Sequence, residues 1–382
     1  MALNKNMAFC LFVLIFTYSW VVLRRLVAWL RLKPVKVPPD YLPFTSVTVI
    51  VAIRNEENQI NGLLQDLKTQ HYPPHLLEVI IVDDYSEDNS AGIIKNFLRE
   101  VPFKMQVIQL AKVGGNPGKK GAVAAGVAAA TGELLVFTDG DCRVPTNWLL
   151  NMAYMYTTFK AKFISGPVFY HKPQNLFGHL QLVEFASLIG TGGSSIALGK
   201  PNMCNGANLA YPKTIFEEAG GFSGNDHIPS GDDEFLMHKV QRLYPKGILF
   251  LKALEATVYT APKPDLAGFL AQRIRWSSKW PAYHNVGVKV LAVLVFGVNL
   301  GLFVAAILAA LGYFWVKFLL WAILFKILVD IIFLSPILSF FKKKKYLLLV
   351  APLQLIYIPY VVLTALVGLK GNYTWKGREI KK

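Results

Sequence analysis

Cysteine is scarce in this sequence: the 382 residues include only three, and one of them, Cys10, lies in an uncharged apolar segment. So few cysteines offer no disulfide framework, which is typical of a protein in a reducing compartment. Histidine is also infrequent, and His171, His179, His227 and His238 show none of the spacings of metal ligands. We therefore expect these histidines to be ordinary polar residues.

Acidic residues are in the minority, since 24 Asp and Glu stand against 40 Lys and Arg, which gives a formal charge of +16. Such a charge suggests nucleic acid as a partner, but no basic stripe interleaved with aromatic residues runs along the globular part of the chain. Much of the positive charge instead flanks apolar segments, where it would meet anionic lipid head groups. We therefore expect no nucleic acid partner, and the remaining charge would suit an anionic substrate.

Charge is absent from residues 7–23 and sparse in residues 288–369, apart from the four lysines at 342–345. The whole chain is 53% hydrophobic, with a mean hydropathy of +0.38, whereas residues 40–265 have the composition of a globular domain. These features predict a membrane protein in which one aqueous domain stands between hydrophobic ends.

The first apolar segment is long, and no small-residue cleavage site follows it, so we interpret it as an uncleaved anchor. Five basic residues follow it within residues 24–36, whereas only Lys5 precedes it. The positive-inside rule then puts the N-terminus outside and the aqueous domain in the cytosol of a multi-pass membrane protein.

Residues 288–313 and 317–341 read as two further spans, and the second contains Lys326 and Asp330, four residues apart and able to pair on one helix face. If residues 346–369 crossed once more, the basic C-terminal tail would lie outside, against the same rule. Because this segment contains Pro352 and Pro359, we favour a broken, re-entrant or interfacial segment with a cytosolic tail.

Within the aqueous domain, short β-rich runs alternate with helical stretches. One such stretch carries Ile60, Leu63, Leu64 and Leu67 at helical spacing. The strands are expected at 47–53, 78–82, 105–110 and 133–137, with a helix over 118–132. Alternation of this kind predicts a mostly parallel sheet with helices on both faces, whose ligands bind beyond the carboxyl ends of the strands.

Polar clusters follow three of these strands, at residues 54–57, 83–86 and 139–141. In the last cluster Asp139 and Asp141 stand one residue apart, and two carboxylates this close repel unless positive charge lies between them. One interpretation is a solvated polar turn. The other is a divalent cation held by hard oxygen ligands, with phosphate oxygens completing its shell.

The motifs occur in the order VTVIVAIRNEE, VIIVDDYSEDNS, GKKGA, TDGD, NGANLAYPK, GDDEFLMHKV and QRIRW. Over residues 46–280 this order resembles the family 2 glycosyltransferases of the GT-A fold. The resemblance implies an α/β fold, a Rossmann-like mixed sheet, with transmembrane helices at both ends. The membrane arrangement resembles that of ceramide glucosyltransferases and related bacterial lipid glycosyltransferases, although Q-x-x-R-W also occurs in processive synthases of cellulose, chitin and hyaluronan.

The resemblance implies a donor site for a nucleotide sugar, with a UDP-sugar favoured. Its nucleoside would lie against Ala52, Arg54, Glu56, Asp83 and Asp84. Lys119, at the head of a helix, would bind the diphosphate, and Asp139 and Asp141 would hold Mg²⁺ or Mn²⁺ against it. The alternatives are turn-forming aspartates and a solvated lysine. The family usually has Pro-Ala before Arg-Asn-Glu, whereas Ala52-Ile53 stand here.

The resemblance also implies the residues that carry the chemistry. Asp233 would be the base that takes the proton of the acceptor hydroxyl in an inverting transfer, and its neighbour Asp232 could raise its pKa by like-charge repulsion. A helix start with acids that complement the helix dipole is a compatible alternative. The acceptor side would be formed by Asn205, Gly206, Ala207 and Asn208.

Gln272, Arg275 and Trp276 form the last motif. In related enzymes it packs over the diphosphate and the acceptor; Arg275 could bind phosphate as a bidentate fork, and Trp276 could stack on a sugar. The alternative is an amphipathic helix at the membrane interface, and we expect both to hold. Residues 375–378 (WKGR) are similar to the W-R-x-G-R ending of the ceramide enzymes, but one residue shorter.

The expected divisions are an anchor with a basic segment (1–36), a cytosolic GT-A domain (40–265), an amphipathic interface helix (266–284), a membrane region of two to three segments (288–370) and a basic tail (371–382). The leading hypothesis is an inverting, metal-dependent glycosyltransferase that works at the cytosolic leaflet. It would move one sugar from a nucleotide donor to a lipid or glycan acceptor. A processive polysaccharide synthase is the alternative, but such synthases carry more spans. A scaffold without activity is disfavoured because every acidic position is retained.

Overall fold

The computed structural model describes residues 2–224, 231–279, 285–369, 373–375 and 378–380. Two compact units emerge. The globular unit comprises Leu32–Lys172 and Ser195–Pro262, and the helical unit comprises Met1–Arg31, Pro173–Ser194 and Lys263–Lys382.

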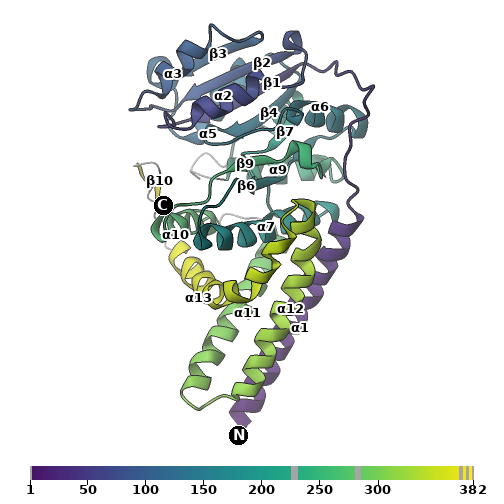
Figure 1. The fold of residues 1–382 in the computed structure, drawn as a ribbon, viewed down its shortest axis with the longest axis vertical. Coiled ribbons are helices and arrows are strands. Elements are labelled where there is room, and N and C mark those ends of the chain that lie inside the picture. Colours follow the sequence, from purple (N-terminus) through teal and green to yellow (C-terminus); the bar gives the residue numbers. More distant parts are fainter. Residues whose placement is uncertain (1, 225–230, 280–284, 370–372, 376–377, 381–382) are drawn as a thin grey trace. The chain divides into compact units, whose positions relative to one another are not determined.

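The globular unit is built on a seven-stranded sheet in the order β3-β2-β1-β4-β7-β5-β8 (Figure 1). Its strands are β1 (Val47–Ile53), β2 (Leu77–Asp83), β3 (Lys104–Gln109), β4 (Leu134–Asp139), β5 (Phe163–Ser165), β7 (Leu209–Pro212) and β8 (Ile248–Phe250). The first four in this order run parallel, whereas β7 is antiparallel to both of its neighbours. The mixed α/β sheet confirms the predicted fold class.

Helices connect the strands, as the alternating sequence pattern predicts. They are α2 (Ile60–Lys68), α3 (Ser90–Phe97), α4 (Leu110–Val113), α5 (Lys119–Ala129), α6 (Trp148–Phe159), α8 (Lys213–Glu218) and α9 (Asp232–Leu243), with short 3₁₀ turns at Pro74–Leu76 and Leu254–Ala256. A small parallel pair, β6 (Val168–Tyr170) and β9 (Val258–Thr260), lies outside the main sheet.

The core of this unit forms as the sequence pattern indicates. The four apolar residues of α2 at helical spacing are all buried. Helix α5 approaches the sheet closely at Gly126, where an added Cβ would lie 2.6 Å from Cγ2 of Ile50. The small residues of the Ala-rich stretch therefore bring the N-terminus of α5 near the carboxyl edge of the sheet.

The helical unit contains α1 (Ala2–Arg31), α7 (Leu176–Ala197, of which the last three residues belong to the globular unit), α10 (Leu266–Ser277), α11 (Val286–Ala310), α12 (Val316–Phe340), a 3₁₀ turn (Lys344–Leu349), α13 (Val350–Gly368) and a hairpin of β10 (Tyr373–Trp375) and β11 (Arg378–Ile380). Among the described residues, four helical segments are long and apolar enough to cross a membrane: Asn4–Arg31, Val286–Ala310, Val316–Phe340 and Lys344–Gly368.

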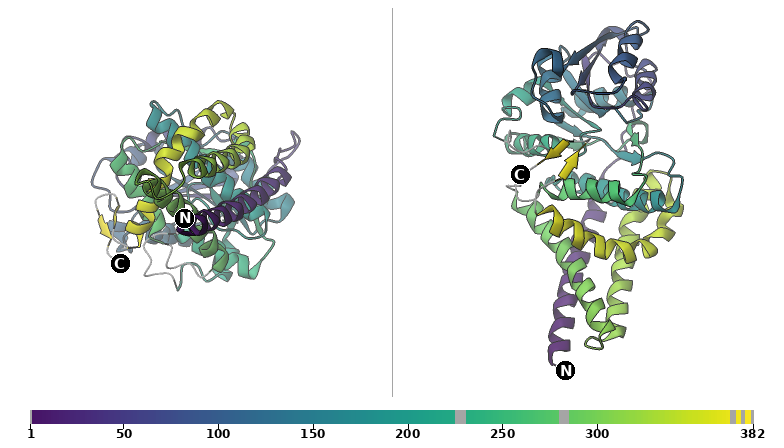
Figure 2. Two further views of the ribbon diagram at one scale, coloured as in Figure 1. Left: turned by 90° about the horizontal axis from the view of Figure 1, so that it is seen from below. Right: turned by 90° about the vertical axis from the view of Figure 1, so that its left-hand side faces the viewer.

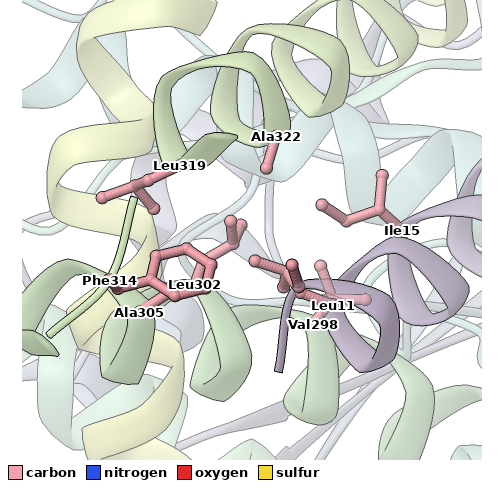
Figure 3. Close-up of a cluster of buried hydrophobic side chains, with 9 residues drawn as sticks. Leu11, Ile15, Val298, Leu302, Ala305, Phe314, Leu319 and Ala322 are labelled. Carbon is pink, nitrogen blue, oxygen red and sulfur yellow. The ribbon is translucent and has the colours of Figure 1, made fainter. Parts of the chain in front are cut away.

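Apolar side chains join the first three of these helices. Figure 3 shows the cluster, which is formed by Leu11 and Ile15 of α1, Val298, Leu302 and Ala305 of α11, Phe314, and Leu319 and Ala322 of α12. All of these side chains are buried. Many residues on the outer faces of the same helices are apolar and exposed, as lipid-facing helices require.

A buried polar network also lies among these helices. The Lys326 ammonium is 2.8 Å from Oδ2 of Asp330 and 2.8 Å from Oε1 of Gln354. The Gln354 amide donates to Asp330 at 2.9 Å, and the Tyr18 hydroxyl donates to the other Asp330 oxygen at 2.5 Å. The predicted pairing of Lys326 with Asp330 is confirmed, and the network extends it to α1 and α13.

Helix α13 is uninterrupted from Val350 to Gly368, so of the predicted alternatives (a broken, re-entrant or interfacial segment) the broken one is wrong. Pro359 lies inside the helix, and Pro352 lies in the first turn, where the missing N–H has no helical partner to lose. Within the helical unit, α13 runs across the direction of α1 and α12, alongside α10 (Figures 1 and 2). Its transverse course is the feature that the interfacial interpretation of residues 346–369 requires.

Candidate active site

The loops that follow β1 and β2 are tied together by Arg54. Its side chain is buried, donates to the carbonyl oxygens of Asp84 (3.0 Å) and Tyr85, and pairs with Glu87 at 2.8 Å. Asn55 and Tyr85 have positive φ angles of 52° and 57°. The two loops therefore form one layer at the carboxyl ends of the strands, where the family resemblance implies the nucleoside.

Asp83 and Asp84 have different partners. Oδ1 of Asp83 accepts from the backbone N–H of Ser86 at 3.0 Å, which is the turn interaction that the alternative interpretation predicts. Oδ1 of Asp84 accepts from the N–H of Gly118 at 2.8 Å. Asp84 therefore joins the second polar cluster to the glycine-rich loop before α5.

The remaining predicted nucleoside contacts lie in the same layer. The N–H of Glu56 donates to Oγ of Ser90 at 2.8 Å, and the side chain of Glu56 is buried. Ala52 on β1 stands in register with Val82 of β2 on one side and with Asp139 of β4 on the other. A small residue at position 52 leaves the sheet edge open beside Asp139.

Lys119 reaches the aspartate cluster from the first turn of α5. Gly118 caps this helix with a φ of 104°, a conformation that favours glycine. The Lys119 ammonium lies 2.5 Å from Oδ1 of Asp139, and the two side chains are 29% and 33% exposed. Burial lowers the pKa of Lys119, but Asp139, Asp232 and Asp233 outweigh it and raise that pKa above its ordinary value.

Helix α9 brings two carboxylates to the same place. It begins at Asp232, after Gly231 in the left-handed conformation, and Oδ1 of Asp233 accepts from the N–H of Glu234 at 2.9 Å. A Cβ placed on Gly206 would lie 3.2 Å from Oδ2 of Asp233 and 3.3 Å from the Lys119 ammonium. Gly206 therefore lies directly beside both groups.

These polar groups surround a pocket with an apolar floor. The floor residues come from the sheet, α5, α9 and the segment between α8 and α9: Ile50, Ala52, Val123, Phe137, Leu209, Tyr211, Phe222 and Leu236. Sequence reasoning missed Tyr211, which is buried and stacks on Phe137 with ring centroids 4.7 Å apart. Burial, with Asp232 and Asp233, raises the pKa of the Tyr211 phenol, so this hydroxyl stays protonated beside the carboxylates.

The predicted acceptor-side residues divide into two groups. Gly206 borders the pocket, whereas Asn208 is fully buried. The amide of Asn208 donates to the carbonyls of Pro167 (2.7 Å) and Ala256 (2.8 Å) and accepts from Nε1 of Trp148 at 2.9 Å. Oδ1 of Asn205 accepts from the N–H of Ala207 at 3.0 Å, and Ala207 is buried. The asparagines therefore shape the turn that presents Gly206.

Asp139 and Asp141 provide a donor set for a cation bound together with a ligand. Within the described part of the chain, no group of three or more His, Cys, Asp or Glu forms a complete metal cage. Among the same residues, Asp141 makes no ion pair, and its Oδ1 accepts only a weak contact from Sγ of Cys142 at 3.6 Å. Two carboxylates fit Mg²⁺ or Mn²⁺, because these ions are commonly held by one or two carboxylates together with substrate phosphates.

The last motif lies on α10 of the helical unit, and its second residue, Arg273, is one that sequence reasoning missed. Arg273 is buried and pairs with Glu184, with Nε 3.0 Å from Oε1. The Tyr360 hydroxyl donates to the same oxygen at 2.8 Å. Gln272 accepts from Arg273 at 2.5 Å, and the guanidinium carbon lies 4.4 Å from the ring centroid of Trp276. Gln272 and Trp276 therefore surround Arg273, and the predicted substrate contacts of the motif stay predictions.

Comparison with known proteins identifies the domain. Residues 48–220 match the model of the family described as Glycosyl transferase family 2. These residues form a family 2 glycosyltransferase domain. The predicted family is thereby confirmed, and the domain contains Lys119, Asp139 and Gly206.

Relatives of the glycosyltransferase domain differ in what they make. A poly-beta-1,6-N-acetyl-D-glucosamine synthase of Staphylococcus epidermidis is 23% identical over 282 residues, which are 70% of this chain and 64% of that protein. A beta-monoglucosyldiacylglycerol synthase of Synechocystis sp. is 30% identical over 126 residues, 31% of this chain and 26% of that protein. The chain thus spans less than two thirds of the length of these relatives.

A solved structure supports the fold over almost the whole chain. The mannosyltransferase PcManGT from Pyrobaculum calidifontis, in complex with GDP-Man and Mn²⁺, has a TM-score of 0.60 and 21% identity, and the match covers 93% of this chain and 98% of that one. The GT-A fold predicted from the sequence is therefore confirmed.

Proposed function

We propose that this protein is an inverting, metal-assisted glycosyltransferase that moves one sugar from a UDP-sugar to a membrane lipid at the cytosolic leaflet. The observation that carries the proposal is the convergence of Lys119, Asp139, Gly206 and Asp233 at one pocket. These groups come from four separate segments of the globular unit, and they meet at the carboxyl edge of the sheet, where ligands bind in α/β folds.

Donor binding would use the layer of loops and the start of α5. The nucleoside would lie against the buried Arg54 loop with Asp83 and Glu56, and the diphosphate would lie at the N-terminus of α5, where the free N–H groups and Lys119 favour negative charge. Asp139 and Asp141 would hold Mg²⁺ or Mn²⁺, which supplies positive charge for the leaving diphosphate.

Transfer would proceed by a single displacement. Asp233 takes the proton of the acceptor hydroxyl as its oxygen attacks the anomeric carbon, the bond from that carbon to the diphosphate breaks, and the configuration inverts. The position of Asp233 supports this role, because its Oδ1 is held by the N–H of Glu234 while Oδ2 faces the space beside Gly206.

A lipid acceptor is favoured by the character of the helical unit. Lys326, Asp330 and Gln354 are buried and use their polar atoms on one another and on Tyr18. A channel for a polymer needs polar groups that hydrogen-bond sugars, and this network does not offer them. The transverse α13 beside α10 suits an enzyme that works at the membrane surface with its tail in the cytosol (Figure 2).

The experiment is to incubate the purified full chain in lipid nanodiscs with UDP- and GDP-sugars and to identify products by mass spectrometry. We expect a single sugar to be added to lipid from a UDP-sugar. Asp233→Asn should lose this product, whereas Asp40→Asn, at an exposed linker site, should keep it. A ladder of oligosaccharides would instead support a processive synthase. The relative from Staphylococcus epidermidis is named as a synthase of such a polymer.

A further inference from the structure

The metal carboxylate Asp139 already has a cation beside it. Oδ1 of Asp139 lies 2.5 Å from the Lys119 ammonium, which is an ion-pair distance. Among the pocket-lining residues that the structure describes, Lys119 is the only cation, and it faces the carboxylates of Asp232 and Asp233 as well. Lys119 thus balances negative charge on both sides of the pocket.

The place of the ammonium has two consequences. A divalent ion that approaches Asp139 alone must displace Lys119 or bind beside it, against charge repulsion. A nucleotide diphosphate supplies the negative charge that the ammonium would meet instead, because Lys119 stands in the first turn of α5, where phosphate groups bind.

We propose that Lys119 is an internal counter-ion that holds Asp139 in the free enzyme and releases it when a nucleotide diphosphate binds, so that the metal and the nucleotide bind together. This inference rests on the proposed function, and it assigns Lys119 a positioning role toward the metal site in addition to its contact with the diphosphate. It implies that Mn²⁺ alone binds weakly and that the nucleotide strengthens its binding.

The coupling is reciprocal and therefore measurable from either side. If UDP raises the affinity for Mn²⁺ by some factor, then Mn²⁺ raises the affinity for UDP by the same factor. A lysine that competes with the ion increases this factor in two ways. It weakens Mn²⁺ binding without UDP, and it contributes to UDP binding once it is displaced from Asp139. Replacing Lys119 by a neutral residue must reduce the factor.

The experiment measures Mn²⁺ binding to the full chain in detergent by electron paramagnetic resonance, with and without UDP. The variants are Lys119→Gln, which removes the charge, and Lys119→Arg, which keeps it. The matched control is Lys95→Gln at an exposed site on α3, which removes one positive charge from the same unit. Asp139→Asn identifies the signal that belongs to the site.

Lys119→Gln is expected to bind Mn²⁺ alone about tenfold more tightly than the unmodified protein, because a neighbouring charge within about 5 Å changes binding by at least this factor. Its UDP coupling factor should fall at least about tenfold, while Lys119→Arg and Lys95→Gln stay within about twofold. If Lys119→Gln binds Mn²⁺ without UDP no more tightly than the unmodified protein does, and its UDP coupling is normal, the counter-ion role of Lys119 is overturned while the proposed function stands. Absence of site-specific Mn²⁺ binding to the unmodified protein with UDP would overturn both the inference and the metal assignment.

Discussion

Gly206→Ala should lower the rate of transfer while leaving the fold almost as stable as before. Gly206 has no left-handed φ that would strain an alanine, so the backbone tolerates the change. The new methyl carbon, however, would lie 3.2 Å from Oδ2 of Asp233 and 3.3 Å from the Lys119 ammonium. Both distances are shorter than the usual contact of about 3.5–4.0 Å between non-bonded atoms.

The expected magnitude follows from these distances. Relief of both contacts requires shifts of a few tenths of an ångström in the two charged groups, and a displacement of about 1 Å in a reacting group costs on the order of 10²-fold in rate. We therefore expect a loss of about tenfold in kcat, which corresponds to about 1.4 kcal/mol. The free energy of unfolding should change by less than about 1 kcal/mol, since both neighbours are side-chain ends.

The assay is steady-state transfer kinetics together with thermal unfolding of the same preparation. Gly297→Ala on α11 is the matched control, because its Cβ would meet only Cδ2 of Leu14 at an ordinary 3.7 Å. A rate for Gly206→Ala within twofold of the control would refute the placement of Gly206 beside the reacting groups. A large loss of stability would show that the effect acts through the fold.

Three further outcomes are expected. EDTA should abolish transfer and Mn²⁺ or Mg²⁺ restore it, whereas Asp139→Asn should be inactive at any metal concentration; full activity in EDTA would exclude the metal. Arg273→Met should destabilise the protein by about 3–5 kcal/mol, because Glu184 then stays buried without its partner, and the double variant with Glu184→Gln should recover part of this loss in thermal unfolding. Burial lowers the pKa of His238 from its ordinary 6.5 to about 4, so as the pH falls the unfolded state takes up the proton before the folded state does. The free energy of unfolding should therefore fall by up to about 1.4 kcal/mol per pH unit from pH 6.5 toward 4. His238→Gln should flatten this slope in denaturant titrations.

Local patterns in the sequence predicted the elements well. The run VTVIVAI is strand β1 with the expected bounds, Val47–Ile53, because β-branched residues bounded by polar ones leave few alternatives. The spacing of Lys326 and Asp330 gave their ion pair, since residues four apart share a helix face. Both inferences depend only on residues near one another in the chain.

Contacts between distant segments were not accessible in this way. The Lys119–Asp139 pair depends on the position of α5 along the sheet, and the close approach of the helix to the sheet at Gly126 helps to fix that position. Arg273 pairs with Glu184, which lies 89 positions away in the sequence. The Q-x-x-R-W pattern does not include Arg273 and indicates only its neighbours Gln272, Arg275 and Trp276. Pro352 and Pro359 suggest a break in α13, but Pro352 lies in the first turn, where a proline removes no helical hydrogen bond, and the helix accommodates Pro359 in its interior.

Single-turnover kinetics of Asp233→Asn test most directly whether Asp233 is the base of the transfer. The amide is almost the same size as the carboxylate and still accepts from the N–H of Glu234, but it takes no proton at neutral pH. If Asp233 is the base, calorimetry should show normal donor affinity, and the transfer rate should fall by about 10²–10⁴-fold. Loss of donor binding with the rate of transfer preserved would contradict this role.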